Sequence, residues 1–128
     1  MKTNAVVWFE IYVNDMARAR AFYEAVLQVT LEPAEKIAEN WPELWMFPGE
    51  NNASGASGAL VRMVGDEEST GGGSTLVYFN CADCAEQISR VSEHGGRVIR
   101  DKFAIGPYGF IAIAMDTEGN RIGLHSMR

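Results

Sequence analysis

The feature that most constrains this chain is an order of elements that occurs twice, half a chain apart. Residues 6–13, VVWFEIYV, alternate as a strand rich in β-branched and aromatic side chains, and Asp15 follows as the cap of a predicted helix. Residues 75–81, TLVYFNC, predict a second strand, and Asp83 caps the helix after it. Asp83 lies 68 residues after Asp15 in a chain of 128, so the pattern indicates two halves of similar design.

Three further strands are expected after each helix, so each half reads strand, helix, three strands. One helix covers only one face of its sheet, and the other face needs a partner or a ligand. We therefore expect an α+β fold in which two βαβββ modules form a curved mixed β-sheet around a cavity, with the helices on the outer face. The remaining elements are expected as helices over 16–28 and 85–96, and as strands near 30–37 and at 44–48, 58–64, 97–101, 110–116 and 120–126.

The chain is expected to form one domain, residues 1–128. Module one is placed at 5–64, a Gly-rich and acidic linker at 65–74, and module two at 75–128. A net charge of −6 with scattered Lys and Arg argues against a nucleic-acid partner. No apolar run approaches the roughly 20 residues of a membrane span, and the N-terminus does not resemble a secretory signal. With only two cysteines, a cytoplasmic protein is the expectation.

Two stretches resemble the vicinal oxygen chelate superfamily, which includes glyoxalase I, bleomycin-resistance proteins and extradiol dioxygenases. WFEIYVNDMARARAFYEAVL, 8–27, is similar to the opening strand and helix of that family. GGRVIRDKFAIGPYGFIAIAMDTEGNRIGLHS, 95–126, is similar to its ending. The resemblance covers nearly the whole chain and implies the paired-module fold, but it does not select a reaction, because isomerases, lyases, dioxygenases and binding proteins share this scaffold.

The resemblance also implies where a metal would be held. Metal-dependent members use four residues, usually His and Glu, on the first and last strand of each module. By position these fall on Trp8, Leu76, Gly123 and one residue of 58–64, a segment without Asp, Glu or His. Indole, leucine and glycine side chains offer no metal ligand. We therefore expect no metal and no other cofactor, and expect the missing Cβ of Gly123 to enlarge the cavity for an organic ligand.

Strand alternation predicts which side chains line the cavity. In the strand 58–64 the register decides between two pairs, Leu60 with Arg62 or Ala59 with Val61. The predicted ligand-binding residues are Trp8, Tyr12, Trp45, Phe47, Arg62, Tyr78, Asn80, Arg121 and Gly123.

Glu10 and His125 are the predicted catalytic residues. A carboxylate among aromatic side chains is a candidate general acid or base. Alternatively, Glu10 forms a structural ion pair with Arg62 or Arg121, or an arginine holds a carboxylate of the ligand. His125 lies near a strand end, where it either takes part in chemistry or is hydrogen-bonded only.

These features predict a glyoxalase-like protein that lacks the usual metal site and binds a small organic molecule in an aromatic cavity. The alternative is a lyase or isomerase of the glyoxalase type, with Glu10 as general acid or base. The acidic chain suits a cationic ligand, and the family habit of pairing chains implies a homodimer. No nucleic-acid or membrane partner is expected.

Overall fold

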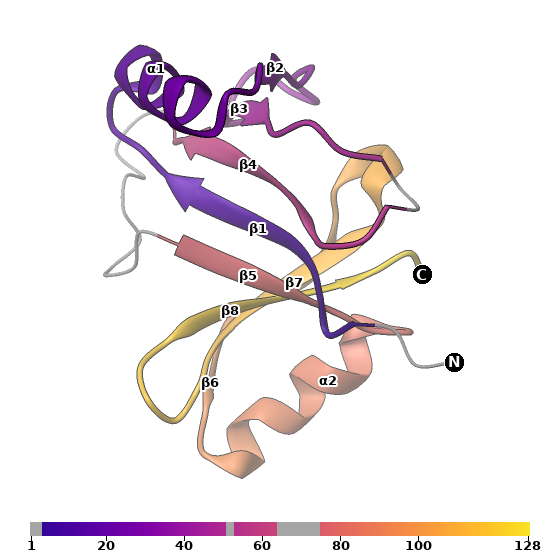
Figure 1. Cartoon of the computed structure of the whole chain (residues 1–128). Coiled ribbons are helices and arrows are strands. Elements are labelled where there is room, and N and C mark those ends of the chain that lie inside the picture. Colours follow the sequence, from indigo (N-terminus) through magenta and orange to yellow (C-terminus); the bar gives the residue numbers. More distant parts are fainter. Residues whose placement is uncertain (1–3, 51–52, 64–74) are drawn as a thin grey trace. The chain divides into compact units, whose positions relative to one another are not determined.

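The computed structural model describes residues 4–50, 53–63 and 75–128. In this part of the chain each half has the order strand, helix, three strands (Figure 1). The predicted α+β class with two βαβββ modules is confirmed. The N-terminal module contains β1 (Val6–Tyr12), α1 (Met16–Leu27), β2 (Glu32–Pro33), β3 (Glu43–Met46) and β4 (Ser57–Arg62). The C-terminal module contains β5 (Thr75–Asn80), α2 (Cys84–Val91), β6 (Arg97–Ala104), β7 (Phe110–Met115) and β8 (Arg121–Ser126), with 3₁₀ turns at Ser92–His94 and Gly106–Tyr108.

The chain separates into two compact units that nearly coincide with these modules. One is Trp8–Thr75, and the other is Leu76–Arg128 together with residues 4–7. The backbone N–H of Asn80 donates to the carbonyl of Ala5 at 2.9 Å, which ties the start of the chain to the C-terminal unit. The predicted linker, 65–74, lies outside the described residues.

The strands of both modules follow one topology. In the N-terminal module the order across the sheet is β2-β3-β4-β1, with β1 parallel to β4 and the other pairs antiparallel. In the C-terminal module the order is β6-β7-β8-β5, with β5 parallel to β8 and the other pairs antiparallel. The repeat of elements seen in the sequence is therefore also a repeat of strand pairing within each module.

Both predicted helix caps are present. Oδ1 of Asp15 accepts a hydrogen bond from the N–H of Arg18 at 3.0 Å, and Oδ1 of Asp83 accepts one from the N–H of Ala85 at 2.9 Å. The 3₁₀ turn after α2 ends at Gly95, whose φ of 94° is the left-handed conformation that glycine adopts without strain. Neither α1 nor α2, the helices of the described ranges, is long and apolar enough to cross a bilayer.

The helix faces differ in how well they are covered. Met16 and Tyr23 of α1 pack against the N-terminal sheet around the buried Leu60. Helical spacing places other apolar side chains of α1 beside Tyr23, but the structure leaves three of them more than half exposed, because almost the whole circumference of this helix is apolar and the pattern does not show which side faces the sheet. These exposed side chains are Phe22, Val26 and Leu27.

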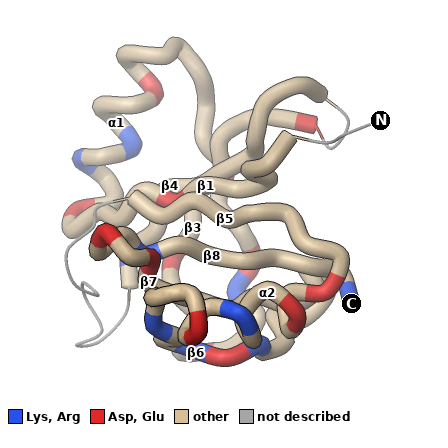
Figure 2. The backbone as a smooth tube through the Cα atoms, turned by 90° about the horizontal axis from the view of Figure 1, so that it is seen from below, with Lys and Arg blue, Asp and Glu red and all other residues tan. Residues whose placement is uncertain are grey.

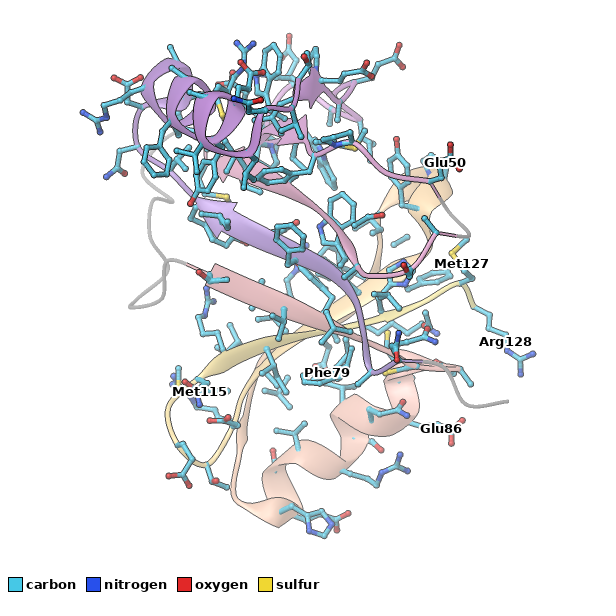
Figure 3. All side chains as sticks on the ribbon, in the orientation of Figure 1. Glu50, Phe79, Glu86, Met115, Met127 and Arg128 are labelled. Atoms are coloured by element: carbon cyan, nitrogen blue, oxygen red, sulfur yellow. The ribbon has the colours of Figure 1, made fainter. Side chains whose placement is uncertain are left out.

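The core of the C-terminal module lies between α2 and its sheet. Cys84 and Ile88 of α2 pack on Leu124 of β8, and Phe79 of β5, labelled in Figure 3, lies against the same cluster. Ser126 is the buried polar residue of this region, with 1% of its surface exposed. Its Oγ accepts the backbone N–H of Cys84 at 3.0 Å, at the first turn of α2. A single hydroxyl thus joins the end of β8 to the start of α2.

Replacing Asp83 by asparagine is expected to flatten the acid dependence of stability. The hydrogen bond from Lys102 (2.8 Å) and then that from the N–H of Ala85 hold the pKa of Asp83 below its usual value. Because the folded pKa is lower than the unfolded one, this stabilisation is present above about pH 4 and is lost as the pH falls through the folded pKa. Urea unfolding from pH 7 to 2 measures the effect. Asp101→Asn, at an exposed aspartate of the same strand as Lys102, is the control, and equal pH profiles for both variants would contradict the assignment.

Candidate functional site

The carboxylate of Glu10 is held by two neighbours on its own strand. The indole Nε1 of Trp8 donates to Oε2 at 3.1 Å, and the hydroxyl of Tyr12 donates to Oε1 at 2.6 Å. All three residues are half-buried and lie at alternate positions of β1, so they share the face predicted for them. Each carboxylate oxygen accepts one of these bonds. The carboxylate is therefore fixed in direction.

Three other predicted ligand-binding residues of this module lie on the opposite face. In the register, Ile11 pairs with Leu60 and Leu60 with Trp45, so Trp45 is on the α1 side of the sheet. By the same register Arg62, two residues after Leu60, is also on that side. The Phe47 ring lies 5.8 Å from that of Tyr23 on α1, measured between centroids. The prediction that Trp45, Phe47 and Arg62 share a surface with Glu10 is therefore wrong.

The register also explains that error. Glu10 pairs with Ala59 and Tyr12 with Val61, which settles the choice between the two pairs of β4 in favour of Ala59 and Val61. Both side chains are buried, with 0% and 2% of their surface exposed. A shift by one residue exchanges the faces of a strand, and the sequence of 58–64 is apolar on both. The residues of β4 that lie beside Glu10 and Tyr12 are therefore aliphatic, in place of the predicted Arg62.

Arg62 and Trp45 instead belong to a surface network on the α1 side, around Glu43. Oε1 of Glu43 accepts from Nε of Arg62 at 3.2 Å, and Oε2 accepts from the indole Nε1 of Trp45 at 3.0 Å. The guanidinium of Arg20 lies 3.4 Å above the Trp45 ring centroid, which is a cation–π contact. The network joins α1 to β3 and β4. An ion pair of Arg62 with Glu10 is therefore corrected to the pair with Glu43.

Five predicted residues of the C-terminal module do share one face. Tyr78 pairs with Gly123 and Asn80 with His125 across the parallel strands β5 and β8. Arg121 lies two residues before Gly123 and hence on the same side. The opposite side of these strands packs on α2 through Phe79 and Leu124, so this face is the one that the helix does not cover.

Gly123 does not leave open space on this face. A Cβ at this position would lie 2.5 Å from Cε2 and 2.8 Å from Cγ of Tyr78, so the tyrosine ring occupies the volume that a side chain would need. Tyr78 is 6% exposed, which shows that its ring is held in place. The expectation that Gly123 enlarges a cavity is therefore wrong. The glycine makes room for an aromatic ring on the adjacent strand.

His125 is anchored to the loop before β7. Its Nε2 lies 2.6 Å from the carbonyl oxygen of Tyr108. A carbonyl only accepts, so Nε2 carries the proton and Nδ1 is the ring nitrogen left to take another. This hydrogen bond joins β8 to the 3₁₀ turn Gly106–Tyr108 before β7.

The sequence analysis missed two arginines on the same face. β6 pairs with β7 as Arg97↔Met115 and Arg100↔Ile113, and Ile113 in turn pairs with Gly123. Arg97 and Arg100 are three residues apart, and strict alternation would place them on opposite faces. The register shift between Val98 and Arg100 brings them onto one face. No sequence signal marks that shift, so periodicity could not have found this arrangement.

The residues at the family's metal positions do not fit a metal. The indole of Trp8 donates to Glu10, Leu76 is a buried aliphatic side chain, and the side-chain volume at Gly123 is filled by Tyr78. The register makes Ala59 the counterpart of Gly123, since Ala59 pairs with Glu10 as Gly123 pairs with Tyr78. None of these four positions supplies a ligand atom. Within the described ranges, His, Cys, Asp and Glu form no group of three or more that could hold an ion.

Cys81 has the properties of a structural thiol. It lies beside the α2 core, and burial, followed by the neighbouring Cys84, raises the pKa of its thiol above the usual value. A higher pKa means less thiolate at neutral pH and hence lower reactivity.

The amino-acid sequence matches a known protein family. The family model described as Glyoxalase/Bleomycin resistance protein/Dioxygenase superfamily matches residues 5–124. The chain belongs to this superfamily. The match includes both modules, so the resemblance to the vicinal oxygen chelate fold is confirmed. No curated protein matches this glyoxalase-superfamily chain.

Solved structures agree with the family at the level of the fold. A hypothetical protein from Bacillus halodurans C-125 has a TM-score of 0.74 at 14% identity, covering 99% of this chain and 96% of its own. Methylmalonyl-CoA epimerase from Mycobacterium tuberculosis has a TM-score of 0.67 at 17% identity, covering 97% and 88%. A Streptomyces coelicolor methylmalonyl-CoA epimerase in complex with 2-nitronate-propionyl-CoA has a TM-score of 0.68 at 17% identity, covering 98% and 95%. These identities establish a common fold and leave the reaction open.

Proposed function

We propose that this glyoxalase-superfamily protein binds a small organic molecule on a sheet face that the helix of the module does not cover. The observation that carries the proposal is the Glu10 carboxylate held between Trp8 and Tyr12. Two aromatic side chains and an oriented carboxylate give an apolar surface with a directional acceptor, which is the composition of a small-molecule site. In the C-terminal module, Tyr78, Asn80 and Arg121 offer a similar mixture of aromatic and polar groups.

The side chains at the family's four metal positions support the proposal of binding without a metal ion. The four positions that would ligate an ion hold an indole, two aliphatic side chains and a glycine under a ring. The function therefore depends on the side chains themselves, through aromatic contact and hydrogen bonding, and no step is assigned to an ion.

The second candidate is a lyase or isomerase of the glyoxalase type. What favours it is again Glu10, because a carboxylate fixed by two donors can act as a general base without first reorienting. Nδ1 of His125 is a further group of the C-terminal module that can accept a proton. In this reaction Glu10 would take a proton from carbon and return it to a neighbouring atom of the same substrate.

A pair of matched tryptophan substitutions tests the binding site. We expect Trp8→Phe to weaken ligands found in a thermal-shift screen of aromatic acids, amines and neutral amides by about fivefold, because it removes one hydrogen bond to Glu10. Trp45→Phe makes the same chemical change on the α1 side of the sheet, where the indole donates to Glu43, and should leave affinity unchanged. Titration calorimetry measures both. Equal losses in the two variants, or a screen without ligands, would refute the proposed site.

The enzyme alternative has its own assay. The substrate is the methylglyoxal–glutathione hemithioacetal, and metal content is measured in the same samples. Turnover by the wild-type protein that is lost in Glu10→Gln would favour the lyase or isomerase. Absence of turnover in the wild-type protein, together with ligand binding that depends on Trp8, would favour the binding protein.

We further propose that the protein acts as a homodimer in the cytoplasm. Sedimentation equilibrium tests the dimer, since one chain has a mass of 14.1 kDa and a dimer twice that. A single species of one-chain mass at micromolar concentration would contradict it.

A further inference from the structure

The face of the C-terminal sheet that α2 does not cover has its residues in three rows across the strands. Antiparallel partners lie side by side on one face, so the strand register defines the rows. The first row is Arg97, Met115 and Arg121; the second is Arg100, Ile113, Gly123 and Tyr78; the third is Phe103, Ile111, His125 and Asn80. Three arginines therefore gather in the first two rows, beside an apolar centre of half-buried side chains.

Two irregularities of β6 produce this arrangement. Between Val98 and Arg100, and again between Arg100 and Phe103, β6 has one residue more than its partner β7. Each extra residue turns the following side chain back to the face it would otherwise leave, so Arg97, Arg100 and Phe103 all face the same way. Bulges are known to direct side chains in this manner, and here they concentrate positive charge.

The arginine side chains lie along the apolar part of this face. Nη2 of Arg97 is 3.9 Å from Sδ of Met115, and the guanidinium of Arg100 lies 3.5 Å over the ring of Phe103. Met115, labelled in Figure 3, marks the point where β7 runs into the turn before β8. Stacked guanidinium groups keep their edge N–H donors available for a ligand.

The charges of the three arginines are not neutralised by the ion pairs of the described residues. Those pairs are Arg20–Glu24, Arg62–Glu43 and Lys102–Asp83. In the β7–β8 turn, the carboxylate of Asp116 accepts from the N–H groups of Glu118 and Asn120, both at 2.8 Å. Figure 2 shows blue Lys and Arg positions and also red acidic positions along β6, a strand that contains Asp101, within a chain of net charge −6. A local cluster of cations in an acidic protein can attract anions to this face alone.

We infer that Arg97, Arg100 and Arg121 form an anion subsite, and that the molecule bound is an organic anion with a carboxylate or phosphate group and an apolar body. The guanidinium groups hold the anionic group by charge-assisted hydrogen bonds. Ile111, Ile113 and Phe103 contact the apolar body. The inference rests on the proposed function, since it names the chemical class of the ligand. An anionic ligand takes the place of the cationic ligand that the net charge of the chain suggests.

Three probes of one shape test the anion subsite. We expect 2-naphthoate and 2-naphthyl phosphate to bind the full chain and 2-naphthamide to bind at least tenfold more weakly, because the amide has no charge. Methyl-labelled methionine places a reporter in the first row, and the Met115 resonance should shift on titration with either anion. The ratio of the two anion affinities distinguishes a carboxylate from a phosphate ligand.

Charge-matched variants complete the test. Arg121→Gln and Arg100→Gln should each weaken the anions by about tenfold and leave the affinity for the amide unchanged. Arg90→Gln removes the same charge from α2, on the other side of the sheet, and should have no effect. Equal binding of amide and anions, or equal affinities in all variants, would overturn the anion subsite and leave the proposed function intact. Binding of none of the three probes, with ligands of another class found in the screen, would overturn the subsite as well.

Discussion

Gly123→Ala is expected to lower the free energy of unfolding by about 3 kcal/mol, the upper part of the range for overpacking in a core. The new Cβ would lie 2.5 Å from Cε2 of Tyr78, far inside van der Waals contact. The ring is 6% exposed and cannot swing into solvent without losing its packing. Either the ring or β8 must move, and the strand pairing of Tyr78 with Gly123 makes both displacements costly.

Urea unfolding followed by circular dichroism measures this effect. Gly49→Ala is the matched control, because its Cβ would lie 3.7 Å from Oγ of Ser57, an ordinary contact. A double-mutant cycle separates ring overlap from backbone effects. In the Tyr78→Ala background, Gly123→Ala should no longer destabilise the protein, because glycine inside a strand is less stable than alanine by roughly 0.5–1 kcal/mol. An alanine at 123 as harmless as one at 49 would show that the ring does not fill this space.

Ser126→Ala is expected to destabilise the protein by about 2 kcal/mol, the cost of leaving a buried donor without a partner. The serine Oγ accepts the N–H of Cys84, a group at the first turn of α2 that no helical carbonyl can reach. The same hydroxyl donates to the carbonyl of Arg128 at 2.8 Å. Alanine removes both bonds. Water can replace the bond at the carbonyl of the exposed Arg128, but the N–H of Cys84 is buried beside Ser126, which is 1% exposed, and is left without a partner.

The control for this prediction is Ser89→Ala in the same module. The Ser89 hydroxyl donates to the carbonyl of Glu86 at 2.7 Å but is exposed, so water can take over the bond and the cost should stay within about 0.5 kcal/mol. Thermal and urea unfolding of both variants give the comparison. If the two alanines have the same effect, the buried hydroxyl does not connect β8 to α2 as described.

Much of the architecture could be predicted from the sequence because its signals are local. Asp15 and Asp83 mark helix starts through their own side chains, and the alternation in β1 correctly joined Trp8, Glu10 and Tyr12 on one face. Periodicity within one strand does not depend on neighbouring strands, which is why these predictions needed no knowledge of pairing.

The parts that failed depend on pairing between strands. The face of Arg62 follows from which residue of β4 lies beside Glu10, and a shift of one residue reverses it. Arg97 and Arg100 share a face only because β6 carries extra residues, and no composition signal announces them. Gly123 was predicted to leave a gap because the sequence shows a missing side chain but not the Tyr78 ring that fills it.

The close fit of Tyr78 over Gly123 restricts how this protein can change over generations. A carboxylate introduced at 123, the substitution that would begin to restore a metal ligand there, collides with the ring before it can coordinate anything. The tyrosine would have to be lost first, and that loss alone weakens the packing of β5 on β8. A metal ligand at position 123 therefore requires two mutations in a fixed order, and the first of them, the loss of Tyr78, is destabilising. The effect of a mutation on β8 thus depends on the residue on β5, which is epistasis between two neighbouring strands.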